Sequence, residues 1–166
     1  MEPDKFIEET LRQVVLTVFE QMYFMFPQEV GMKDASECKG DETYIANVGL
    51  KNGGLEVTIA GSAGLCEKIA SAMFGEDREL TQKDVEDVFR EAANIIMGNL
   101  INECAFPGEV SPDIPVARKG MDLEDCKNEH DLNLFFEVES SHFSVHLKGS
   151  AASDLTCSEG NFTSPS

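Results

Sequence analysis

The chain has 166 residues, of which 42% are hydrophobic and 27% charged, so it is long enough for one domain with its own core. Thirty-one Asp and Glu against 13 Lys and Arg give a net charge of −18, which argues against a surface that binds nucleic acid or an anionic membrane. There is no apolar run long enough to span a bilayer and no apolar segment typical of a signal peptide. The cysteines form no C-x-x-C pair, which favours reduced thiols in a cytoplasmic protein: Cys38, Cys66, Cys104, Cys126 and Cys157.

The first predicted element is a long amphipathic helix over Phe6–Phe26, which ends before Pro27. Near its end, Met22, Phe24 and Met25 are either core side chains or a face that binds a partner. Because Met and aromatic residues usually fill cores, we expect them in the core. The apolar positions that recur at helical spacing are Ile7, Leu11, Val14, Val15, Val18, Phe19, Met22, Tyr23 and Phe26.

A β-hairpin is predicted next, after a polar, glycine-containing stretch. Its strands are Thr43–Leu50 and Leu55–Ala60, which are rich in β-forming residues. The pair Asn52-Gly53 between them favours a type I′ turn, in which both central residues take positive φ.

Two helices follow the hairpin. Ser62 is the predicted N-cap of the first, which ends at Gly75. The second begins at Thr81, where Asp84 three residues on forms an approximate capping box, and runs to about Cys104. The first of these helices carries its apolar side on Leu65, Ile69, Ala72 and Met73.

An extended segment over Glu109–Lys119, broken by two prolines, leads into an acidic loop over Met121–Asp131. Leu132–Glu139 and Phe143–Leu147 then predict a second hairpin around Ser140-Ser141. In its last strand, apolar residues alternate with polar ones, so we expect one buried face and a solvent face that carries His142, Ser144 and His146. The two histidines would lie about 13 Å apart, too far to bind one metal ion, and we expect both at the surface.

The predicted order is helix, hairpin, helix, helix, extended segment and hairpin. This order indicates an α+β fold in which long helices pack on one face of a mainly antiparallel sheet. We expect one domain over residues 1–149 and a flexible polar tail over residues 150–166.

The helix that begins at Thr81 is the most informative element. On a helical wheel, an arc of roughly 80° carries polar residues and Gly but no Lys or Arg, and Lys83 and Arg90 lie at its border. We call this arc the polar stripe, and its residues are Asp84, Asp87, Glu91, Asn94, Gly98 and Asn102. Helix stability alone does not favour it, because like charges four residues apart repel and Asn and Gly are poor helix formers. The wheel leaves two interpretations open, a solvated acidic face and a binding face. The opposite side carries the predicted core residues Val85, Phe89, Ala92, Ala93, Ile96 and Leu100.

Four residues of the polar stripe match a known signature. Asp87, Glu91, Asn94 and Gly98 have the spacing D/S-x-x-x-E-x-x-N-x-x-x-G of the CheC/CheX/FliY phosphatases of bacterial chemotaxis. The order of elements resembles this family from residue 6 to about residue 148, and the single copy of the motif is most similar to CheX. Shorter similar segments lie at residues 67–75, 97–99 and 110–112.

The resemblance implies a phosphatase that accelerates hydrolysis of the aspartyl phosphate on a CheY-type response regulator. It implies that Glu91 pairs with the receiver's Lys, that Asn94 holds the attacking water, and that Asp87, Gly98 and Asp84 support docking. It also implies that the receiver supplies Mg²⁺ while this chain has no metal or cofactor of its own, and that the protein forms a homodimer through β-strands.

A second interpretation has the same fold without turnover. The protein would then be a binding module or adaptor for a receiver domain, or part of a flagellar-switch or signalling assembly. The Glu91 and Asn94 pair favours the phosphatase, whereas an unrelated ligand-binding domain would predict an apolar pocket in place of a polar stripe.

Overall fold

The computed structural model describes residues 3–31, 43–51, 53–104, 106, 109–120 and 132–149. The predicted acidic loop over residues 121–131 and the tail over residues 150–166 lie outside them, as do Cys38, Cys126 and Cys157. The helices and strands are α1 (Pro3–Tyr23), β1 (Gln28–Val30), β2 (Thr43–Gly49), β3 (Glu56–Ser62), α2 (Ala63–Phe74), α3 (Gln82–Glu103), β4 (Val116–Lys119), β5 (Leu132–Val138) and β6 (Ser141–Lys148).

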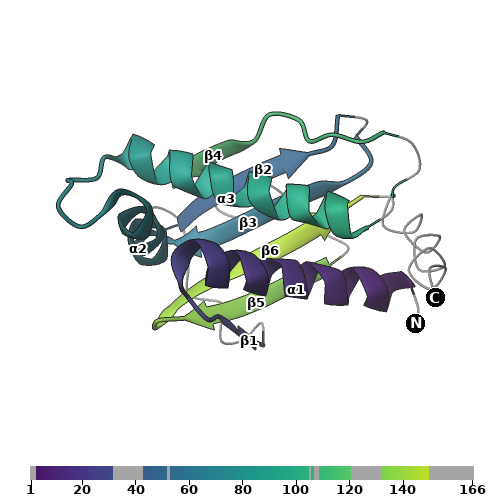
Figure 1. Ribbon diagram of the computed structural model, residues 1–166, viewed down its shortest axis with the longest axis horizontal. Coiled ribbons are helices and arrows are strands. Elements are labelled where there is room, and N and C mark those ends of the chain that lie inside the picture. The colour runs from purple at the N-terminus through teal and green to yellow at the C-terminus, as the bar shows by residue number, and fades with distance from the viewer. Residues whose placement is uncertain are drawn as a thin grey trace.

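The strands form one antiparallel sheet in the order β1-β5-β6-β3-β2-β4, and α1, α2 and α3 lie on one face of it (Figure 1). The predicted α+β fold is confirmed. The chain repeats one arrangement, because α1 with β1, β2 and β3 has the same order as α3 with β4, β5 and β6. The short strand of each half pairs with the hairpin of the other half: β1 of the first half pairs with β5, and β4 of the second half pairs with β2.

The core lies between the helices and this face of the sheet. The ring of Phe143 on β6 stacks between Phe19 of α1, at a centroid distance of 4.3 Å, and Phe136 of β5, at 5.0 Å. On the other half, Tyr44 of β2 meets Phe89 of α3 edge to face. These aromatic contacts attach α1 and α3 to opposite halves of the sheet and hold the two helices side by side.

Helix α1 ends at Tyr23, three residues before the predicted end. Phe24 has a φ of 56°, which stops the helix, and the Met25 N–H donates to the Phe19 C=O at 3.1 Å. Met25 is buried, as expected of a core side chain, but Phe24 is 80% exposed, so the core interpretation is wrong for Phe24. The left-handed backbone turns that side chain away from the core.

Both predicted hairpins form, but their turns differ from the expectation. At the first, the Gly53 N–H donates to the Leu50 C=O at 2.9 Å, so Gly53 is the last residue of the turn and not a central one. The type I′ geometry occurs instead at the second hairpin, where Glu139 and Ser140 have φ values of 48° and 65°. Because Val138 pairs with Ser141, this turn begins one residue earlier than predicted.

Strand β1 was not predicted. On helix α2, the buried residues are Leu65, Cys66, Ile69 and Ala70. Leu65 and Ile69 of the predicted apolar side are buried, whereas Ala72 and Met73 are exposed. A strand of three residues has too short a pattern to recognise, and β1 exists because its residues pair with β5 far along the chain.

The prediction of a solvent face on β6 is wrong for Ser144 and His146, which is only 1% exposed. Strand β6 lies in the middle of the sheet, so neighbours from both sides cover its polar side chains. Here His146 Nδ1 lies 2.6 Å from Asn133 Oδ1 and its Nε2 lies 2.7 Å from Ser144 Oγ, while Phe135 packs edge-on against the imidazole. His142 is half-buried.

Candidate functional site

Helix α3 begins with the capping box that the sequence predicts. The Thr81 Oγ1 accepts from the Asp84 N–H at 3.1 Å, and Asp84 Oδ2 accepts from the Thr81 N–H at 3.0 Å. Arg78 Nη2 lies 3.0 Å from the other oxygen, Asp84 Oδ1. The Thr81 hydrogen bond, assisted by the Arg78 charge, holds the pKa of Asp84 below its usual value. The Asp84 carboxylate therefore stabilises the start of the helix.

The predicted core side of α3 is buried, so the wheel assignment is confirmed: Val85, Phe89, Ala92, Ala93, Ile96 and Leu100. The polar stripe faces away from the sheet. Glu91 is exposed, whereas Asp84, Asp87, Asn94 and Gly98 are half-buried. All the predicted site residues lie on this one helix, and the stripe is accessible to a second protein.

Asp87 does not present a free negative charge. Lys83 Nζ lies 3.0 Å from Asp87 Oδ2, and Arg90 Nη2 lies 2.6 Å from Asp87 Oδ1. The Lys83 hydrogen bond, and then the Arg90 charge, hold the pKa of Asp87 below its usual value. Lys83 and Arg90, which the wheel places at the border of the polar stripe, thus pair with a carboxylate inside it. The wheel did not indicate this pairing.

Glu91 and Asn94 differ from these neighbours. Among the residues that the structure describes, neither side chain makes a hydrogen bond or an ion pair within the chain. Their i, i+3 spacing places the two side chains next to each other on one face of the helix. The negative charge of Glu91 also reaches α1, where it adds to burial in raising the pKa of Tyr23. A carboxylate and a carboxamide therefore stand together, available to an external partner.

Gly98 lies one turn beyond Asn94, in open surroundings. A Cβ built on Gly98 would have no atom of the chain within 4 Å beyond its immediate helix neighbours. The fold therefore has no packing reason for glycine here. A close approach of another molecule to the helix backbone would be such a reason.

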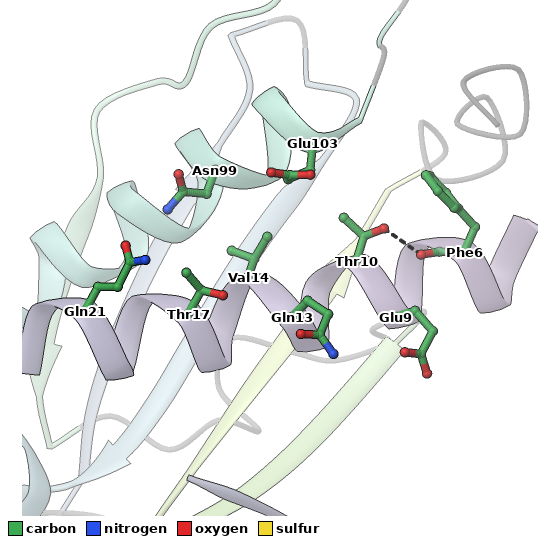
Figure 2. A pocket seen from close by; sticks show the side chains of 9 residues that line it. All are labelled: Phe6, Glu9, Thr10, Gln13, Val14, Thr17, Gln21, Asn99 and Glu103. Carbon is green, nitrogen blue, oxygen red and sulfur yellow. Dashed lines mark hydrogen bonds between the residues drawn. The ribbon is translucent and has the colours of Figure 1, made fainter. Parts of the chain in front are cut away.

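A groove of about 460 Å³ runs between α1 and α3 and was not anticipated from the sequence. Figure 2 shows Thr10, Thr17 and Gln21 along α1, with Asn99 and Glu103 on α3 across the groove from them. The groove lies beside the polar stripe but includes none of its residues. Its residues come from two helices far apart in sequence, so no local pattern could have found it.

Of the two helices that correspond in the repeated arrangement, only α3 carries the motif. The buried residues of α1 have the same spacing as those of α3, with Ile7 corresponding to Val85 and Phe19 to Met97. On this correspondence Gln13 occupies the position of Glu91, and Leu16 that of Asn94. Helix α1 thus has the same place in its half without the Glu and Asn side chains.

No three His, Cys, Asp or Glu side chains come together as a metal site within the described part of the chain. The two cysteines described, Cys66 and Cys104, are buried, and burial raises the pKa of the Cys104 thiol to about 11. A thiol with a raised pKa is a poor nucleophile. None of the described helices is long and apolar enough to cross a membrane.

Known structures resemble this fold. A chemotaxis protein CheX from Vibrio vulnificus is 15% identical with a TM-score of 0.64, covering 86% of this chain and 95% of its own. A CheX-CheY-BeF3-Mg²⁺ complex from Borrelia burgdorferi matches with 18% identity and a TM-score of 0.62, over 84% of this chain and 95% of the other. FliY from Thermotoga maritima is 15% identical with a TM-score of 0.61, over 96% of each chain.

No curated protein matches the sequence. The model of the family described as "Chemotaxis phosphatase CheX" matches residues 44–137, which are more than half of the chain and include all of α3. The chain therefore belongs to the CheX family of chemotaxis phosphatases.

Proposed function

We propose that this protein accelerates hydrolysis of the aspartyl phosphate on a CheY-type response regulator. The observation that carries the proposal is the pair Glu91 and Asn94, which stand adjacent on the exposed face of α3 without partners among the described residues. Asp84 and Asp87, on the same face, are held by neighbouring cations. Membership of the CheX family and the Borrelia burgdorferi CheX-CheY complex support this choice of substrate.

The reaction suits these two side chains. An acyl phosphate is already activated for hydrolysis, so the enzyme needs to position water and fix the geometry, and no enzyme nucleophile is required. The Asn94 carboxamide donates and accepts hydrogen bonds without a charge that would repel the phosphoryl group, so it would hold the attacking water. Glu91 would pair with the receiver's Lys. The receiver would supply Mg²⁺, and this chain would need no metal or cofactor of its own.

We extend the proposal to the assembly and location of the protein. A CheY-type substrate would place it in the cytoplasm. The family resemblance implies a homodimer joined through β-strands, and β4 offers an edge, because its only ladder partner among the described strands is β2.

An Asn94→Ala variant tests the role of the water. We expect it to lower the rate of receiver dephosphorylation by roughly 100-fold at saturating enzyme, because the attacking water loses its position. The measurement follows the loss of phosphate from a phosphorylated CheY-type receiver of the same organism. Asn102→Ala is the matched control, since it removes an exposed amide from the same helix face. Full activity of Asn94→Ala would contradict the assigned role.

The companion variant Glu91→Ala separates recognition from chemistry. We expect it to bind the receiver more weakly, whereas Asn94→Ala keeps its affinity. If the wild-type protein binds the receiver but leaves the phosphate lifetime unchanged, the phosphatase proposal fails. The adaptor interpretation, with which the similarity to FliY is also compatible, would then hold.

A further inference from the structure

The segment after α1 exposes two aromatic side chains. Phe24 is 80% exposed and Phe26 is 70% exposed, whereas the residues on either side of Phe24, Tyr23 and Met25, are buried. Isolated exposed apolar residues are common, but two phenylalanines at such exposure in three positions form a local apolar projection.

The backbone makes this position unusual. Phe24 has a φ of 56°, a left-handed conformation that glycine adopts freely and a bulky residue adopts at a cost. Glycine is the usual residue where a helix ends in this conformation. The fold alone would therefore favour glycine at position 24, and an exposed phenylalanine recovers none of the cost through packing. Residues that oppose stability in this way are typical of binding surfaces.

The position of Phe24 connects it to the polar stripe. Helix α1 ends beside α2 and the first half of α3 (Figure 1). Tyr23 is close enough to Glu91 to respond to its charge, and Met25 lines a groove with Ser71 and Ala72 of α2. Phe24 lies between these two buried residues in the chain, directly after the end of α1 that adjoins the half of α3 carrying Glu91.

Electrostatics do not supply the affinity that docking on this surface requires. The chain has a net charge of −18, and Asp84 and Asp87 are already paired with Arg78, Lys83 and Arg90. Among the described carboxylates of the polar stripe, only Glu91 has no cation beside it, and a single exposed ion pair contributes little. Buried aromatic anchors, in contrast, dominate the binding energy of many protein interfaces.

We propose that Phe24, assisted by Phe26, is the apolar anchor by which this protein docks a receiver domain next to Glu91 and Asn94. The inference rests on the proposed function for its choice of partner. The anchor inserts into an apolar depression beside the receiver's active site and sets the register in which Glu91 and Asn94 meet it. Phe24 thus determines affinity, whereas Asn94 determines the rate of the bound complex.

The test compares Phe24→Gly, Phe24→Ala and Phe26→Ala with the wild-type protein. Each is titrated with a CheY-type receiver carrying Mg²⁺ and beryllofluoride, and assayed for dephosphorylation. We expect Phe24→Gly to raise Kd and KM roughly tenfold or more and to leave kcat unchanged. Its thermal midpoint should stay equal or rise, since glycine relieves the left-handed backbone. Met73→Ala is the matched control, because Met73 is an exposed apolar side chain of α2 that lies outside the polar stripe and away from the β4 edge.

The outcomes separate this inference from the proposed function. If the wild-type protein is active and Phe24→Gly has the wild-type Kd and KM, the anchor is wrong and the phosphatase stands. If the wild-type protein binds without turnover, the phosphatase is wrong and the Kd of Phe24→Gly still decides the anchor. If the wild-type protein does not bind the receiver, both are wrong. If Phe24→Gly changes the oligomeric mass and not the receiver affinity, Phe24 contacts a second copy of the chain, and the inference is overturned.

Discussion

Glu91 stands on the same face of α3 as Asp84 and Asp87, yet its carboxylate alone has no cation beside it in the described part of the chain. This difference shows that the net charge of the chain does not describe the charge around the polar stripe. A charge of −18 suggests a uniformly negative surface, but around the polar stripe it is compensated locally by lysine and arginine. An approaching lysine would therefore be directed to Glu91 and not to the helix as a whole. The excess charge elsewhere contributes to solubility.

Gly98 is the second informative residue at this scale. Because a Cβ at this position has nothing to collide with, Gly98→Ala should raise the free energy of unfolding by about 0.5–1 kcal/mol through helix propensity. Urea denaturation measures this directly. The bulkier Gly98→Leu should keep the fold but weaken receiver binding, if another surface approaches the backbone here. A loss of stability in Gly98→Ala would contradict the open space around the Gly98 Cα.

At the scale of the element, α3 is held in place before any partner arrives. The capping box at Thr81 and Asp84 begins the helix, and the pairs of Asp87 with Lys83 and Arg90 brace its first turns. Its buried side packs on the sheet across the whole length. Glu91 and Asn94 therefore project from a rigid backbone, as positioning of water requires.

Removing the cap tests this arrangement. Thr81→Ala should lower the free energy of unfolding by about 1 kcal/mol, because the first turn loses a hydrogen-bond acceptor. Thermal unfolding of the variant against wild type gives the value, and Thr10→Ala on α1 is a control within a helix interior. Unchanged stability of Thr81→Ala would contradict a structural role for the box.

The pH dependence of the cap follows from the direction of its pKa shift. The pKa of Asp84 is lowered on folding, so the ionised carboxylate stabilises the fold at pH values above its ordinary pKa of about 4. That stabilisation disappears as the pH falls from about 4 through the lower pKa of the folded state. The stability difference between wild type and Asp84→Asn should accordingly be present at pH 7 and smaller at pH 3. A difference that persists unchanged at pH 3 would exclude this explanation.

At the scale of the whole molecule, the two edges of the sheet are the short strands β1 and β4. Val116 on β4 and Ile114 just before it are exposed. An edge with exposed apolar side chains is suited to pairing with another strand, and a charged residue on an edge opposes such pairing. The proposed homodimer would therefore use the apolar start of β4, at Val116 and Ala117, since the exposed Arg118 and Lys119 follow in the same strand.

Val116→Lys should convert a strand-joined dimer into a folded monomer, because the charge would be buried against the second copy. Light scattering over a range of concentrations gives the mass, and circular dichroism checks the fold. Val116→Thr keeps the β-branched shape without the charge and should remain dimeric. A wild-type protein that is monomeric at every concentration would refute the dimer.

What the sequence by itself determined is local. The spacing of Glu91 and Asn94, the capping box, the helix ends at Ser62 and Gly75 and the existence of both hairpins depend on residues a few positions apart, and all are present in the structure. The α+β class also followed, because the order of the elements leaves few ways to cover one sheet. The domain end at residue 149 stays a prediction.

Only the tertiary structure decided the features that join distant residues. Strand β1 forms by pairing with β5, and His146 is buried because β6 lies in the middle of the sheet. Phe24 is exposed because the buried residues on either side of it fix the backbone in a left-handed turn. The groove between α1 and α3 exists because the two helices pack side by side on the sheet. Periodicity predicts which side of a helix faces inward, but burial and charge pairing depend on neighbours that chain folding brings from far away.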